Sequence, residues 1–145
     1  MRILGLDVGE KTIGVAVSDP LGWTAQGLGV VRRDRPEEQV MGELKKLAQD
    51  YQVGLIVVGL PRNMNGTLGI QGQKVLEFTR RIRAQLGLPV ETWDERLSTA
   101  SAERILLAAD VSRAKRKKVI DKMAAVVILQ NYLDAMHKRS RNGGN

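Results

Sequence analysis

Residues 3–19, which read ILGLDVGEKTIGVAVSD, constrain the fold more than any other stretch of the chain. Residues 2–8 and 13–17 are apolar, β-branched runs joined by the short polar connection GEKT, a pattern typical of a β-hairpin. Asp7 lies inside the first run. A buried carboxylate is costly unless a cation or hydrogen bonds compensate it. The sequence therefore raises the question of what compensates Asp7.

The remainder of the chain predicts a third strand and then alternating helices and strands. The run VGLIVVGLP is continuously apolar, as expected of a strand buried on both faces. Spacing of apolar residues and the turn residues predict strands at 25–33, 53–61 and 90–93, and helices at 36–51, 75–86, 102–109 and 124–132. This order predicts an α/β fold with one mixed sheet and helices on both faces. We expect a single domain over residues 1–137 and a basic, disordered tail over 138–145.

Composition excludes several classes of site. Aromatic residues make up 3% of the chain and hydrophobic residues 43%, so the core must be mainly aliphatic. The absence of cysteine removes disulfides and thiolate zinc sites. The single histidine, His137, lies in the basic tail and is expected to be solvated, which disfavours triad chemistry. With no signal-peptide pattern or membrane-spanning apolar run, we expect a cytoplasmic protein without a membrane partner.

Acidic residues occupy three positions where strands end or a helix begins. Asp7 ends the first predicted strand, Asp94 and Glu95 end the strand in WDERLST, and Asp121 precedes the last predicted helix. Asp121 lies at helical spacing from the apolar positions of that helix, so it faces the sheet. Each acid alone has a simpler structural interpretation: a turn aspartate, acids favoured at a helix N-terminus, and an N-cap.

Taken together, the acids predict a metal site. If they converge, repulsion between like charges would raise their pKa values or require a cation. Oxygen ligands favour a hard divalent ion, Mg²⁺ or Mn²⁺. Clusters of this kind serve phosphoryl chemistry, in which the ions activate water and stabilise the leaving oxygen.

The charge of the chain suits a polyanionic partner. Net charge is +7, and SRAKRKK at residues 112–118 and RRIR at 80–83 concentrate it. Such a run is commonly a solvated surface, but beside a metal site it favours contacts with a phosphate backbone. Because aromatic residues are few, recognition of shape and phosphates is favoured over base stacking. GLDVGEKT is not a phosphate-binding loop, because its glycine spacing is wrong and a strand follows it.

The stretches GLDVGEKTIGVAVSD, VVGLPRNMNGT, WDERLSTASAE and SRAKRKKVIDKMAAVVILQNYL occur here in this order. In combination they resemble the bacterial YqgF family of pre-16S rRNA nucleases, also called Holliday-junction-resolvase-like proteins, over about residues 1–135. The resemblance implies a ribonuclease-H-like fold with a five-stranded mixed sheet flanked by helices. It also implies a divalent-metal site made by Asp7, Glu95 and Asp121, with Asp94 in a secondary, electrostatic role.

The activity implied by the resemblance is metal-dependent hydrolysis of phosphodiester bonds, in 5′-end processing of pre-16S rRNA during ribosome biogenesis. The segment GLPRNMNG is implied to lie beside the site. Asn65 is not expected to bind metal, since many relatives carry an acid at its position. The expected nucleic-acid contacts are Lys11, Arg62, Asn65, Arg96, Arg113, Lys115, Arg116, Lys117 and Lys118.

Two alternative functions remain open from the sequence, and a third is disfavoured. A Holliday-junction resolvase acting on DNA would be expected to be a symmetric dimer, and the sequence is compatible with a monomer or a homodimer. A non-catalytic RNA-binding ribosome assembly factor would not need to bind divalent ions at the acids. LDVGEKTIGVA also resembles the phosphate-binding hairpin of actin-like ATPases, but the chain has room for only one of their two lobes.

Overall fold

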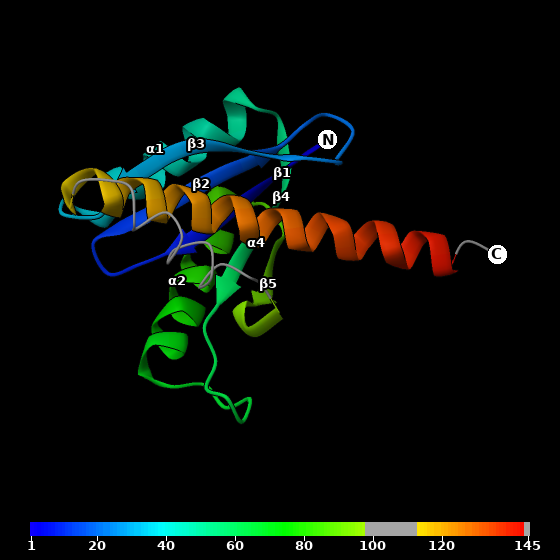
Figure 1. The fold of residues 1–145 in the computed structure, drawn as a ribbon. Coiled ribbons are helices and arrows are strands. Elements are labelled where there is room, and N and C mark those ends of the chain that lie inside the picture. Colours follow the sequence, from blue (N-terminus) through cyan, green and yellow to red (C-terminus); the bar gives the residue numbers. More distant parts are fainter. Residues whose placement is uncertain (98–112, 144–145) are drawn as a thin grey trace.

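The computed structural model describes the backbone of residues 1–97 and 113–143 and the side chains of 1–96 and 123–140 (Figure 1). The elements in chain order are β1 (Arg2–Val8), β2 (Thr12–Ser18), β3 (Ala25–Arg32), α1 (Glu37–Asp50), β4 (Val53–Leu60), α2 (Ile70–Leu86), β5 (Val90–Asp94), the 3-10 helix η1 (Glu95–Leu97) and α4 (Arg113–Gly143). All five predicted strands are confirmed, and the helix predicted at 102–109 lies outside the described residues. No helix in the described part of the chain has the length and hydrophobicity needed to cross a membrane.

The strands form one mixed sheet in the order β3-β2-β1-β4-β5, which confirms the predicted five-stranded sheet. β1 and β2 make the predicted hairpin, while β1, β4 and β5 run parallel to one another. The carboxyl ends of these three parallel strands therefore meet at one edge of the sheet. Asp7 lies at the carboxyl end of β1, and Glu95 directly follows that of β5.

The two faces of the sheet pack against different helices, because side chains alternate along each strand. Leu4 and Leu6 of β1 belong to the core under α1 and α2, together with Phe78. The opposite face packs against α4, which crosses the sheet in Figure 1. Gly5 lies on this second face, where Leu129 and Ala125 of α4 pack against it.

Gly5 allows α4 to approach β1 closely. A Cβ atom at this position would lie 2.7 Å from the Leu129 Cβ and 3.4 Å from the carbonyl oxygen of Ala125. These atoms are fixed to the helix backbone, so the helix itself must move. We expect Gly5→Ala to lower the free energy of unfolding by about 1–3 kcal/mol, as overpacking does. Urea denaturation measures this. A Gly5→Ala protein with unchanged stability would show that α4 is loosely held.

Helix α4 is longer at both ends than the sequence pattern predicts. It begins at Arg113, so the basic residues from Arg113 to Lys118 form its first turns. Asp121 therefore lies inside the helix, and its interpretation as an N-cap is wrong. At the other end the helix continues to Gly143, through most of the segment that was expected to be a disordered tail.

His137 is a partly buried contact residue, and its prediction as a solvated tail residue is wrong. Its ring stacks on Trp23 in the β2–β3 connection, with centroids 3.7 Å apart and planes at 1°. His137 Nε2 also lies 2.8 Å from the carbonyl oxygen of Gly22. These contacts tie the C-terminal part of α4 to the end of the sheet opposite the acids.

Candidate active site

Asp7 lies on the α4 face of the sheet, two residues beyond Gly5 on β1. Gly14 of β2 is its direct partner in the antiparallel register. On the other side, the pairing of Leu6 with Val58 brings Gly59 of β4 next to Asp7. Both neighbours lack a side chain, which leaves space around the Asp7 carboxylate on this face. Sequence reasoning missed both glycines, although a glycine inside a strand often marks such a close approach.

Glu95, the first residue of η1, folds back over this space. A Cβ atom at Gly59 would lie 2.8 Å from Glu95 Oε1 and 3.2 Å from its Cγ. The same atom would be 2.6 Å from Cδ1 of Ile128 in α4, so the glutamate side chain lies on the α4 face. The structure thus brings two of the three predicted ligands, Asp7 and Glu95, to adjacent positions on one face.

The backbone of α4 leads toward the same edge. Tyr132 contacts Glu91, whereas Ile128 contacts Gly59 further along the parallel strands, so the helix runs opposite to them. Asp121 precedes Ile128 by about two turns, or roughly 10 Å, toward the carboxyl ends of the strands. The structure does not describe the Asp121 side chain. The described residues alone contain no group of three acids or histidines that could hold a metal ion.

Asp94 has a different environment from its neighbour Glu95. Its carboxylate accepts a hydrogen bond from Arg96 Nη2 at 2.7 Å and from the Arg96 backbone N–H at 2.9 Å. Arg62 Nε lies 3.8 Å away. The Arg96 guanidinium, aided by Arg62, holds the pKa of Asp94 below its usual value. Asp94 therefore stays ionised and orients two arginines beside the candidate site.

The same two arginines order the connection between β4 and α2. Arg62 Nη1 donates to the carbonyl oxygen of Gly66 at 2.9 Å, and Arg96 Nη1 donates to that of Met64 at 3.3 Å. Both side chains remain exposed. The segment GLPRNMNG thus sits beside the end of β5, and it presents cations next to the acids.

The other predicted nucleic-acid contacts are distributed over two elements and the β4–α2 connection. Asn65 is exposed and its Oδ1 accepts hydrogen bonds from the backbone N–H and the hydroxyl of Thr67, so the side chain shapes a turn. Lys11 is exposed in the turn between β1 and β2. Five further cations lie in the first turns of α4, where the structure describes the backbone alone: Arg113, Lys115, Arg116, Lys117 and Lys118.

A family model described as "RuvX: Holliday junction resolvase" matches residues 1–135. The chain belongs to this family. A protein of Desulforamulus reducens named "Putative pre-16S rRNA nuclease" is 64% identical over 135 residues, which cover 93% of this chain and 98% of that relative. A Clostridium novyi protein of the same name is 58% identical over 136 residues, covering 94% and 100%. The resemblance to the YqgF family is therefore confirmed.

Solved structures agree on the fold. Thermus thermophilus RuvC superimposes on this RuvX-family chain with a TM-score of 0.53 and 16% identity, covering 94% of this chain and 96% of the other in its complex with a Holliday junction. RuvC without substrate gives the same TM-score at 14% identity. At this level of identity the comparison supports the architecture alone, and it confirms the ribonuclease-H-like fold.

Proposed function

We propose that this RuvX-family protein is a divalent-metal-dependent nuclease that trims the 5′ end of pre-16S rRNA. The observation that carries the proposal is the placement of the Glu95 carboxylate over Gly59, next to Asp7 on the same face. The names of the close relatives support the choice of substrate. The basic surface beside the acids supports a phosphate-rich substrate.

The chemistry of the donor set fits a hard cation. Asp7 and Glu95 offer carboxylate oxygens on one face of the sheet, and the absence of a side chain at Gly59 lets the Glu95 carboxylate lie there. Asp121 is proposed as the third ligand, and Mg²⁺ or Mn²⁺ as the ion. When bound, such an ion supplies Lewis-acid stabilisation of the phosphate and lowers the pKa of the attacking water.

The protein's own side chains would position the substrate. We expect Arg62 and Arg96, which pair with Asp94, to contact phosphates flanking the scissile bond. Lys11 reaches the same edge from the β1–β2 turn. Holding the strand in place lowers the entropic part of the barrier to hydrolysis.

The basic start of α4 gives a separate prediction about binding. Changing Arg113, Lys115, Arg116, Lys117 and Lys118 to glutamine should weaken RNA binding and reduce its dependence on salt. Each lost phosphate contact should lower the slope of log K against log salt by about 0.7 for a single strand. Fluorescence anisotropy at several salt concentrations measures this. Lys45→Gln/Lys46→Gln on α1 is the control, and an equal slope in both variants would make the run a solvated surface.

Cleavage assays with two substrates test the proposed function. A labelled fragment spanning the 5′ end of pre-16S rRNA and a four-way DNA junction are each incubated with Mg²⁺, Mn²⁺ or a chelator. We expect metal-dependent cutting of the RNA. Cutting of the junction instead, by a dimeric protein, would support the resolvase alternative. Binding of RNA without cutting either substrate would identify a non-catalytic assembly factor.

A further inference from the structure

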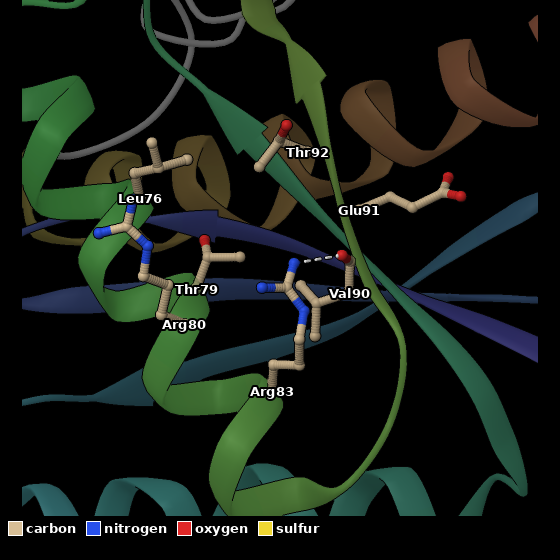
Figure 2. Close-up of a pocket in the computed structure, with 7 residues that line it drawn as sticks. All are labelled: Leu76, Thr79, Arg80, Arg83, Val90, Glu91 and Thr92. Atoms are coloured by element: carbon tan, nitrogen blue, oxygen red, sulfur yellow. Dashed lines mark hydrogen bonds between the residues drawn. The ribbon is translucent and has the colours of Figure 1, made fainter.

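A groove of about 420 Å³ lies between α2 and β5, beyond the carboxylates of the candidate active site (Figure 2). Its α2 wall consists of Leu76, Thr79, Arg80 and Arg83, which recur at helical spacing and so share one face. Its other wall is the strand segment 90–92. The proposed chemistry makes no use of this groove.

Two guanidinium groups give the groove its charge. Arg83 Nη2 donates to the carbonyl oxygen of Val90 at 2.7 Å, which fixes this side chain against the strand (Figure 2). Arg80 is exposed and makes no hydrogen bond or ion pair with any other described residue. It is therefore available to an anionic ligand.

Glu91, the one acid among the described lining residues, does not neutralise these arginines. Its Oε2 accepts a hydrogen bond from the Tyr132 hydroxyl at 2.6 Å, on the α4 side of the sheet. Figure 2 shows its side chain pointing away from Arg80 and Arg83. The α2 side of the groove thus presents positive charge and, from Thr92, a hydroxyl group.

The groove lies on the α2 side of β5, and the strand connects it to the arginines beside the candidate active site, whose carboxylates lie on the α4 side. Thr92 precedes Asp94 by two residues, Asp94 holds Arg96 and Arg62, and Glu95 follows. The length of β5 from Val90 to Asp94 is about 13 Å at 3.3 Å per residue. That distance accommodates roughly four nucleotides of a helical strand at 3.4 Å each. Basic side chains therefore follow the strand from Arg83 to Arg96 and Arg62, which lie beside the acids at its carboxyl end.

We propose that this groove binds backbone phosphates of the nucleic-acid substrate, roughly four nucleotides from the scissile bond. This inference rests on the proposed nuclease function and adds a second point of attachment to it. Arg80, Arg83 and the Thr92 hydroxyl are the donors that would contact the phosphates.

An acidic peptide pairing with the edge of β5 is the competing occupant, and the backbone disfavours it. The carbonyl oxygen of Pro89 accepts a hydrogen bond from the backbone N–H of Ile56 in β4. Carbonyl groups alternate in direction along a strand, so the carbonyl group of Val90 points away from β4. Arg83 already donates a hydrogen bond to this outward-pointing carbonyl oxygen. The first acceptor that an added strand would need is thus taken.

Site-directed cross-linking tests the path. The chain has no cysteine, so Thr92→Cys, Asn65→Cys and Lys46→Cys each carry one attachment point for a photoreactive group. Each is made in an Asp7→Asn background that keeps a labelled pre-rRNA leader intact. We expect cross-links from position 92 to nucleotides distinct from those that position 65 reaches, and none from position 46. Cross-links from position 65 without any from position 92 would contradict RNA binding in the groove but not the nuclease proposal. The absence of cross-links from both positions would contradict the nuclease proposal.

Binding measurements give an independent test. Arg80→Gln/Arg83→Gln should weaken binding about tenfold for RNAs long enough to reach the groove, and should lower the salt slope by about 1.4. Arg80→Gln alone retains the Val90 contact and should give about half of that change in slope. If both variants have the affinity and salt slope of the control Lys45→Gln/Lys46→Gln, the groove does not bind RNA. That result would favour a peptide as its ligand.

Discussion

Asp7→Asn should reduce metal-dependent cleavage at least about 1,000-fold while leaving the fold intact. The substitution removes one negative charge from the centre of the proposed site, but it preserves the shape of the side chain between Gly14 and Gly59. A loss of this size corresponds to about 4 kcal/mol of transition-state stabilisation. Single-turnover rates under saturating enzyme measure the effect, and thermal unfolding monitors the fold.

A matched control separates this charge effect from a general one. Asp50→Asn changes an exposed aspartate at the end of α1 and should leave the cleavage rate unchanged. Isothermal titration with Mn²⁺ should show weaker binding in Asp7→Asn alone. A well-folded Asp7→Asn protein that cleaves at the wild-type rate would remove Asp7 from the mechanism.

Gly59→Ala should lower cleavage about 100-fold with little cost to stability. The added Cβ would lie 2.8 Å from Glu95 Oε1 and 2.6 Å from Ile128 Cδ1. Both atoms are the far ends of flexible side chains, so each can move without disturbing the backbone. Glu95 is then displaced from its place beside Asp7, and a misplacement of about 1 Å commonly costs 100-fold in rate.

Two further variants isolate the displacement of Glu95. Gly42→Ala, in α1, meets no atom within 4 Å of its new Cβ and should leave the activity unchanged. Gly59→Ala/Ile128→Val removes the Cδ1 contact and should remain as inactive as Gly59→Ala, because the contact with Glu95 Oε1 persists. Full activity in Gly59→Ala would show that the observed position of Glu95 is dispensable.

The strands and the sheet could be predicted from the sequence because β-branched runs and their turn residues are local signals. The distinct surroundings of Asp94 and Glu95 could not be derived locally. Asp94, the last residue of β5, pairs with Leu60 and meets two arginines, whereas Glu95 folds over Gly59 from η1. The different surroundings of the two acids depend on the β4–β5 register, which pairs segments that are distant in sequence.

The errors in α4 and at His137 have physical causes. The basic run offers no apolar periodicity, so the pattern predicts the last helix only from residue 124, although arginine, alanine and lysine are strong helix formers. The basic tail around His137 predicts a solvated side chain, whereas its contact, Gly22, is 115 positions away in sequence. A contact between residues so far apart in sequence cannot be predicted from the local sequence pattern.

The packing of α4 on the sheet also sets the order in which this protein can become active during synthesis. The Gln130 side chain accepts a hydrogen bond from Ala25 across 105 residues, and Leu129 covers Gly5 over a longer span still. At about 5–20 residues per second, translation needs roughly 5–20 s to cover that distance. Throughout this interval the hairpin bearing Asp7 exists without its covering helix. We therefore expect the growing chain to gain the complete site only after residues 113–143 have been made and α4 packs on the sheet.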